Sequence, residues 1–279
     1  MLARAVVALC IGLMPPFPSF AQQNGIGKDR LLFLLGIAPE RSVVGDASAK
    51  RFFRKYRDSD VASAFFGTQL CVLEAPASDV TLKVKEVRGR GDTAAVYEQF
   101  IPQSAIGVVT GSFFGRSASG EPVPLGLVKA DGKKRNKRHP WTGGGIVGGG
   151  SRGVVIEPAR TFADRADLLN AVQSKPLLVE GGIDGIHSDD QVRFDRSAIA
   201  LTSDGRVLFL VISEPGGKGA SIAEFSTLLL KLKSEGGGSI KTALAMDGGP
   251  GAHLYVPSLK QHCGVGIPNY FPNLVYLKP

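Results

Sequence analysis

The chain has 279 residues, 43% of them hydrophobic and 21% charged, with a formal net charge of +8. This composition provides for a hydrophobic core and excludes a wholly disordered protein. Three cysteines are too few for a disulfide-dense scaffold or a multi-cysteine zinc module. The 36 glycines follow no collagen-like period and favour a strand-rich fold with glycine-built loops.

Residues 1–21 have the pattern of a secretory signal peptide. Arg4 supplies the positive start, residues 2–14 are mostly apolar, and Ser19 and Ala21 place small residues at the −3 and −1 positions of a cleavage site. No later segment has the 18 or so consecutive apolar residues that crossing a membrane requires. The sequence therefore predicts an exported protein, periplasmic or secreted, without a stable membrane anchor.

Two cysteines, Cys71 and Cys263, remain after the signal peptide. In an oxidising compartment they form either a disulfide that joins an early strand to the C-terminal segment or two separate buried thiols, and the sequence leaves both open. The positive net charge favours anionic envelope polymers or phosphates as partners. Nucleic acid is not expected, because the compartment is wrong and no aromatic-basic recognition motif is present. The oligomeric state is not determined.

We expect an N-terminal extension at 22–63 and one domain at 64–279. The extension is polar and basic, whereas regular strand patterns begin only near residue 64. Short runs rich in Val, Phe, Tyr or Thr predict the first strands of the domain, at 64–73, 80–87, 94–100 and 106–110.

The middle of the domain is rich in glycine and positive charge. The basic run at 133–139 predicts a solvated loop or a rim that attracts an anionic substrate. Two Gly triplets within 143–150 predict a flexible flap, since no phosphate-binding loop pattern accompanies them. A short helix is expected at 161–172.

The C-terminal third has the clearest pattern. Asp204-Gly205 separates apolar runs at 197–202 and 207–212, which predicts a hairpin. Ser221 and Glu224 form a capping box at the start of a helix, and a third strand is expected at 242–246. Strand, helix and strand at these lengths predict a right-handed parallel crossover. The expected fold class is α+β: a strand-rich mixed sheet with at least one β-α-β crossover, helices packed on the sheet, and Gly-rich loops at one edge.

This topology brings three segments to one edge of the sheet. Arg196 precedes the first strand of the hairpin, Asp247 follows the third strand, and the loop with Lys218 leads into the predicted helix. Ligands of such sheets bind at the carboxyl ends of strands, and a helix N-terminus beside a lysine suits a phosphate.

Five ordered segments together resemble the phosphodiester glycosidase family. They are TGSFF at 110–114, PLGL at 124–127, PLLVEGG at 176–182, RSAIA at 196–200 and AMDGGP at 245–250. The resemblance covers roughly residues 64–256. It departs from the family pattern at Thr110, where the family has Asn, at Ser112, which follows the first Gly, and at Gly251, where the family has Ser.

The resemblance implies hydrolysis of a sugar-1-phosphodiester. Such chemistry needs a carboxylate on the sugar side and positive charge with N–H donors on the phosphate side. Asp247 and Glu180 are the candidate carboxylates, and Arg196 and Lys218 are the candidate phosphate ligands. The alternatives are that Asp247 holds its own turn, that Glu180 is a surface residue and that Arg196 belongs to a structural ion pair.

The remaining candidates lie around the same motifs. Gly248 and Gly249 would let backbone N–H groups approach the ligand, and Thr110 and Ser112 are candidate substrate ligands. His253 beside the Asp-Gly-Gly turn is a candidate acid or base. His187 is expected at the surface, and His139 belongs to the basic run.

No zinc-ligand spacing occurs and no cofactor is implied, although a hard divalent cation between Asp247 and Glu180 stays open. The sequence thus predicts an exported sugar-phosphodiester hydrolase. The altered motifs leave a non-catalytic protein that binds envelope glycans or polyanions on the same fold as the alternative.

Overall fold

Strands dominate the computed structural model, which describes residues 30–57, 67–151, 153–188 and 191–279. The predicted signal peptide at 1–21 and residues 22–29 and 58–63 of the predicted extension lie outside these residues. Within them there are two α-helices, α2 (Thr93–Phe100) and α3 (Ile222–Lys231). No helix in these ranges is long and apolar enough to cross a membrane.

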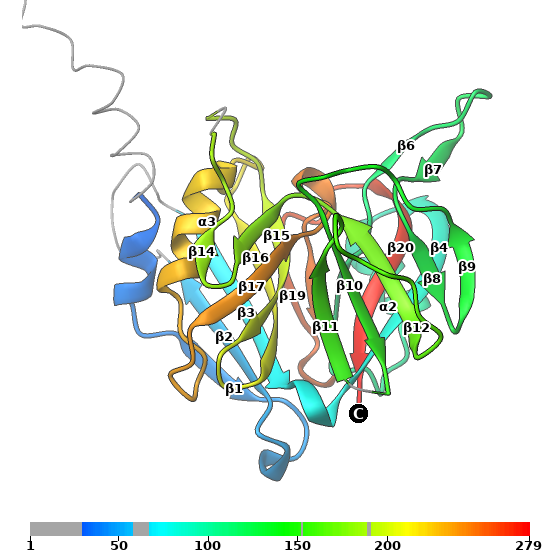
Figure 1. The fold of residues 1–279 in the computed structure, drawn as a ribbon. Coiled ribbons are helices and arrows are strands. Elements are labelled where there is room, and N and C mark those ends of the chain that lie inside the picture. Colours follow the sequence, from blue (N-terminus) through cyan, green and yellow to red (C-terminus); the bar gives the residue numbers. More distant parts are fainter. Residues whose placement is uncertain (1–29, 58–66, 152, 189–190) are drawn as a thin grey trace, which may run out of the picture.

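The strands form three main sheets and one two-stranded ribbon (Figure 1). The eight-stranded sheet runs in the order β1 (Glu40–Val43), β2 (Phe52–Arg57), β3 (Gln69–Pro76), β16 (Arg206–Ser213), β15 (Arg196–Thr202), β17 (Ile240–Ala245), β13 (Leu177–Glu180) and β14 (Ile183–Asp184). One five-stranded sheet has the order β11 (Gly153–Pro158), β10 (Gly145–Gly150), β12 (Leu168–Ser174), β8 (Val128–Ala130) and β9 (Lys133–Asn136).

The other five-stranded sheet has the order β19 (Gln261–Cys263), β18 (Leu254–Val256), β5 (Gly107–Thr110), β20 (Asn269–Lys278) and β4 (Thr81–Gly91). The ribbon pairs β6 (Phe114–Arg116) with β7 (Pro122–Pro124). Five 3-10 turns complete the described elements: η1 (Leu32–Gly36), η2 (Ala47–Ala49), η3 (Ala77–Asp79), η4 (Gly249–Gly251) and η5 (Pro257–Leu259).

The predicted fold class, α+β with helices packed on a mixed sheet, is wrong. The protein is mostly β, and every strand pairing within the described ranges is antiparallel. The strand-helix-strand segment β16-α3-β17 does exist, but β15 lies between its two strands and pairs antiparallel with both. The sequence pattern gave the direction of β17 but not its neighbour.

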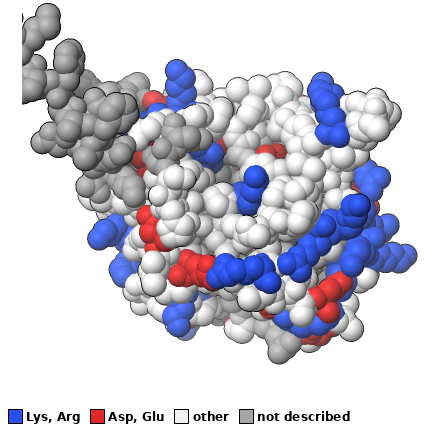
Figure 2. All heavy atoms as spheres, turned by 45° about the horizontal axis from the view of Figure 1, so that its top comes forward, with Lys and Arg blue, Asp and Glu red and all other residues white. Residues whose placement is uncertain are grey.

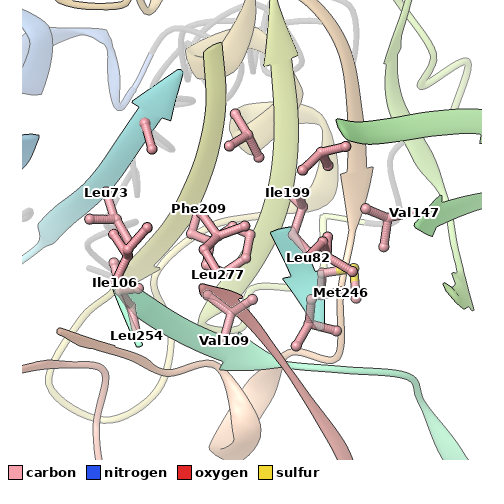
Figure 3. Packing of buried hydrophobic residues seen from close by; sticks show 14 of the residues in the cluster. Leu73, Leu82, Ile106, Val109, Val147, Ile199, Phe209, Met246, Leu254 and Leu277 are labelled. Carbon is pink, nitrogen blue, oxygen red and sulfur yellow. The ribbon is translucent and has the colours of Figure 1, made fainter. Parts of the chain in front are cut away.

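The eight-stranded sheet is buried on both faces, which explains its continuous apolar runs. Ile199 and Phe209 point from β15 and β16 into a core shared with Val109, Leu254, Leu277 and Val147 of the other two sheets (Figure 3). The alternating residues of the same strands, such as Ala200 and Leu210, face Phe225, Leu228 and Leu229 of α3 instead. The sheet edge above this double core is thereby held rigidly.

The described part of the predicted extension joins this architecture. β2 pairs with β3 and adds β1 to the eight-stranded sheet. Leu31 and Leu34 of the η1 segment are fully buried in the cluster that contains α3. Residues 30–57 therefore share the core of the domain.

Two local predictions are wrong because tertiary context overrides local propensity. Residues 94–100 form helix α2 rather than a strand: the Asp92 side chain accepts a hydrogen bond from Ala95 N at 3.1 Å and caps the helix. The helix expected at 161–172 is a loop followed by β12, whose apolar residues pair with β10 and β8.

Residues 145–150 of the predicted glycine flap form the largely buried strand β10 instead. A Cβ atom on Gly149 would lie 2.6 Å from Leu82 O, and one on Gly148 would lie 2.8 Å from Asn170 O. The glycines therefore allow close packing of this sheet against β4 and β12 rather than mobility.

The two cysteines form a disulfide between β3 and β19. The sulfur atoms of Cys71 and Cys263 are 2.05 Å apart and the Cα atoms 6.4 Å apart, across a sequence separation of 192 residues. The bond joins the eight-stranded sheet to a five-stranded sheet through the core, so the alternative of two free thiols is wrong.

Replacing both cysteines with alanine is expected to lower the free energy of unfolding by about 2–5 kcal/mol, because the bond restricts a long loop of the unfolded chain. Urea denaturation of the oxidised protein and the double variant measures the difference. Two reactive thiols in the unreduced, denatured protein would contradict the bond.

Candidate active site

Three strand ends meet at one edge of the eight-stranded sheet, uppermost in Figure 1. Arg196 opens β15 and pairs with Ile212 near the end of β16, while Ala198 pairs with Ala245 at the end of β17. Asp247 therefore emerges beside Arg196, as the sequence predicted. The loop from β16 leads along the same edge to the N-terminus of α3.

A cavity of about 320 Å³ opens between these segments. Its lining consists of Phe113, Lys175, Pro176, Phe194, Arg196, Ser197, Ile222, Ala245, Met246, Asp247, Gly248, Gly249 and Pro250. Figure 2 shows this face of the molecule, where the hollow is mostly uncharged and basic groups stand around it. Mostly apolar walls with a few converging polar groups are typical of small-molecule sites.

The carboxyl group of Asp247 is the buried acid of this cavity. The residue is 7% exposed, and its Oδ2 atom has no hydrogen-bond partner among the described residues. Burial raises the pKa of Asp247 to about 7, against a weaker lowering by the Gly248 backbone N–H. A carboxyl group with such a pKa exchanges a proton readily at neutral pH.

The turn that carries Asp247 is held by hydrogen bonds to neighbouring segments on both sides. Ser197 Oγ donates a hydrogen bond to Asp247 O at 2.7 Å, and Asp247 N donates to Gly111 O at 3.2 Å. Gly249 N donates to Asp195 O at 2.8 Å, and Gly249 has a φ of +59° that favours glycine. The Asp-Gly-Gly sequence thus places one carboxyl group at a fixed point on the edge.

Arg196 lines the same cavity with a fixed guanidinium. Its Nε donates to Ala220 O at 3.0 Å and its Nη2 to Val192 O at 2.8 Å. The guanidinium also lies over the ring of Phe194, 5.3 Å from the centroid. These contacts orient a permanent positive charge beside Asp247, as a phosphate site requires.

A second cation and an aromatic wall were missed by the sequence analysis. Lys175 lines the cavity, and its Nζ lies 5.1 Å from the centroid of the Trp141 ring. Trp141 in turn meets Phe113, another lining residue, edge to face at 6.4 Å. Only the position of Lys175 directly before the family-like segment at 176–182 could have suggested it.

A second cavity of about 260 Å³ adjoins the first and shares Phe194, Gly249 and Pro250 with it. The predicted phosphate ligand Lys218 lines this second cavity and is exposed. Asp195, a buried residue that the sequence analysis missed, also lines this second cavity.

Asp195 shapes the loop between the cavities. Its Oδ1 accepts hydrogen bonds from Glu214 N at 3.1 Å and Gly219 N at 3.2 Å, whereas its buried Oδ2 has no partner within the described part of the chain. Burial raises the pKa of Asp195 to about 6. Only its position directly before Arg196 could have suggested this residue from the sequence, because the family-like segment begins at Arg196.

Thr110 and Ser112 are fully buried and line neither cavity. Thr110 Oγ1 lies 2.6 Å from Tyr97 Oη and donates a short hydrogen bond to Gly251 O. Ser112 Oγ accepts from Asn273 Nδ2 at 2.7 Å. Both side chains support the wall behind the Asp247 turn and are not placed to touch a ligand.

Glu180 is not brought to Asp247. It ends β13 at the turn to β14, where Gly182 N bonds to Lys241 O, whereas Asp247 follows the opposite end of β17. Its carboxylate forms a short ion pair with Arg160 at the surface. The two acids therefore cannot share a cation, and no group of three metal-ligating side chains occurs within the described ranges.

His253 is buried beneath the site and lines neither cavity. Its Nε2 lies 3.0 Å from His262 Nδ1, and burial lowers the pKa of His253 to about 3, so the ring is neutral at neutral pH. His187 is exposed, as expected.

The basic run at 133–139 contains the edge strand β9 rather than a loop alone. Three of its cations are already engaged: Lys134 with Asp164, Arg135 with Glu86, and Arg138 with the carbonyl oxygen of Phe162. The run lines neither cavity.

Comparison with known proteins identifies a matching family and solved structures of similar fold. Residues 103–276 match the model of the phosphodiester glycosidase family. The fold is similar to the zebrafish N-acetylglucosamine-1-phosphodiester alpha-N-acetylglucosaminidase catalytic domain, auto-inhibited by its pro-peptide, with a TM-score of 0.60 and 11% identity over 87% of this chain and 89% of that one.

It is also similar to a hypothetical protein from Synechocystis, with a TM-score of 0.57 and 14% identity over 81% of this chain. This chain spans 62% of the length of that protein. At these identities the likeness concerns the fold alone. No curated protein matches the chain.

The raised pKa of Asp247 predicts a pH-dependent loss of stability. The folded state favours the protonated carboxyl group. The contribution of Asp247 to the free energy of unfolding is therefore fully present below the ordinary pKa of 3.8 and is lost as the pH rises through about 7. The Asp247→Asn variant has no ionisable group there and shows no such loss. The difference in free energy of unfolding, variant minus native, should therefore increase by on the order of 4 kcal/mol from pH 4 to pH 8. Denaturant titrations at both pH values measure this, and a constant difference would contradict a buried, unpartnered carboxyl.

Proposed function

The chain belongs to the phosphodiester glycosidase family, and from this premise we propose that it is an exported hydrolase that cleaves sugar-1-phosphodiesters. One observation carries the proposal: Asp247, a buried acid with one unpartnered carboxyl oxygen, and Arg196, whose guanidinium is held by backbone carbonyl groups, line the same cavity. A glycosidic carbon needs a carboxylate beside it, and an anionic leaving group needs fixed positive charge.

In the proposed reaction Asp247 acts as the base. The ionised carboxylate takes one proton from water, the water oxygen bonds to the anomeric carbon, and the bond from that carbon to the phosphate oxygen breaks. The phosphate leaves with the bonding electron pair as a monoester. Because phosphate is a fair leaving group without protonation, a single carboxylate suffices, and Glu180 has no part.

The positive groups of the site bind the phosphate. Arg196 is held by two carbonyl oxygens, so little conformational freedom is lost when it binds an anion. Lys175 adds a second charge, and the rings of Phe113 and Phe194 offer flat apolar faces to the sugar or the aglycone. Asp195 positions the Gly249 turn and the loop at 214–219.

Export is part of the proposal. The signal-like segment at 1–21 supports it, and so does the disulfide, since such bonds persist in oxidising compartments. The proposed partners are a sugar phosphodiester or an envelope glycan.

Asp247→Asn should lower kcat about 10²–10⁴-fold, because the amide cannot accept the proton from water. The measurement is release of free sugar from a panel of sugar-1-phosphodiesters by the purified protein. Glu180→Gln, the same chemical change at the surface ion pair, is the matched control and should keep the native rate. A folded Asp247→Asn variant with the native rate would remove Asp247 from the mechanism, and glycan binding without any sugar release would favour a binding protein.

The pH dependence of kcat/KM should follow the same carboxyl group. Ionised Asp247 is the active form, and its pKa is about 7, so kcat/KM should rise with pH and level off above that value. A phosphodiester keeps its single charge over this range, so the substrate does not contribute. Initial rates from pH 5 to 9 test the profile; a fall in kcat/KM through pH 7 would instead assign Asp247 as an acid.

A further inference from the structure

The second cavity has apolar side walls and one exposed cation. Its apolar side chains come from Phe194, Pro250, Val265 and Ile267, and its charged residues are Arg193, Asp195 and Lys218. Arg193 already binds both carboxylate oxygens of Glu224 at 2.8 Å. Lys218 is therefore the cation of this cavity that extends into solvent.

Apolar side chains are exposed at the mouth of this cavity. Phe194 is 46% and Ile267 44% exposed, and Val192, two residues before Phe194, is 43% exposed. The described residues include six exposed large hydrophobic side chains. Two of them, Phe194 and Ile267, line this one cavity. Exposed apolar groups that gather around a cavity mark a binding surface.

The two cavities adjoin beside Arg196, where the phosphate would lie. They share Phe194, Gly249 and Pro250, and the Arg196 guanidinium lies over the Phe194 ring at 5.3 Å. A phosphodiester held by Arg196 with its sugar toward Asp247 in the first cavity directs its other ester oxygen toward the second. The group on that oxygen then meets the walls formed by Phe194 and Ile267.

We propose that the second cavity binds the hydrocarbon part of an apolar alcohol, so that the substrate is an amphiphilic sugar-1-phosphodiester. The proposal rests on the proposed function for the position of the sugar. Lys218 at the rim complements the phosphate charge. Burial of the methylene groups against the apolar side chains contributes favourably to the free energy of binding. A polar aglycone such as a second sugar would place hydroxyl groups against the side chains of Phe194, Val265 and Ile267, which offer them no hydrogen-bond partner.

Alkyl phosphates test the cavity without any turnover. Methyl, butyl and octyl phosphate, each kept below its aggregation concentration, are titrated into the native protein by calorimetry. We expect the Kd to fall about fourfold for each added methylene until the cavity is filled. An equal Kd for methyl and octyl phosphate would overturn the proposal.

Variants then locate the effect. The double variant with Val265→Ser and Ile267→Ser should keep the native affinity for methyl phosphate and lose most of the gain from butyl and octyl chains. Leu169→Ser removes an equally exposed leucine on β12, outside both cavities, and should keep the gain. Chain-length dependence that persists in the double variant would overturn the proposal, because the chain would then bind elsewhere.

Two further arms separate the outcomes. With sugar-1-phosphodiesters of methanol and octanol, the octyl ester should have the lower KM at a similar kcat; selective alkyl phosphate binding without turnover of either ester would reject the proposed function and retain the apolar cavity. Association with phosphatidylcholine vesicles without selectivity among the monomeric alkyl phosphates would assign the exposed residues to a membrane surface and overturn the proposal.

Discussion

The burial of one carboxyl group without a hydrogen-bond partner on Oδ2 is the constraint on which the site depends. Taking Asp247 out of water destabilises its ionised form, which is why its pKa lies near 7 rather than 3.8. An isolated turn would rotate this side chain into solvent. Here the turn is bonded to Ser197 on one side and to Gly111 on the other, so the carboxyl group stays where the fold puts it.

The rest of the architecture supplies this rigidity. Ser197 belongs to a sheet that is packed on both faces, while Gly111 follows β5 of a different sheet. The Asp247 turn therefore bridges two layers, and the Cys71–Cys263 disulfide ties the same two layers together deeper in the core. The packing of both sheets thereby offsets the energetic cost of burying the acid, since an unfavourable local arrangement persists where the surrounding structure holds it in place.

What the sequence could predict follows from how local each signal is. The β15-β16 hairpin and the capping box at Ser221 depend on turn and cap residues next to each other in the chain. The meeting of Arg196 with Asp247 was predictable because the strand-helix-strand order fixes the direction of β17, whichever strand it pairs with. The neighbour of β17, the burial of β10 and the distance of Glu180 from Asp247 depend on pairing between distant segments, which periodicity does not encode. Lys175 and Asp195 belong to the site through such pairing, and neither lies within a motif.

The departures from the family pattern at Thr110 and Gly251 are in contact with each other. Thr110 Oγ1 donates to Gly251 O, and a Cβ atom on residue 251 would lie 3.4 Å from Asp247 Oδ2 and 2.7 Å from Asn269 Nδ2. A serine there would bring a hydroxyl group close to the carboxyl oxygen and displace the Asn269 amide. With glycine, Asn269 keeps that space and Asp247 Oδ2 stays without a donor. Gly251 therefore leaves Asp247 in the cavity lining without a donor to Oδ2, and burial keeps the pKa of this carboxyl group high.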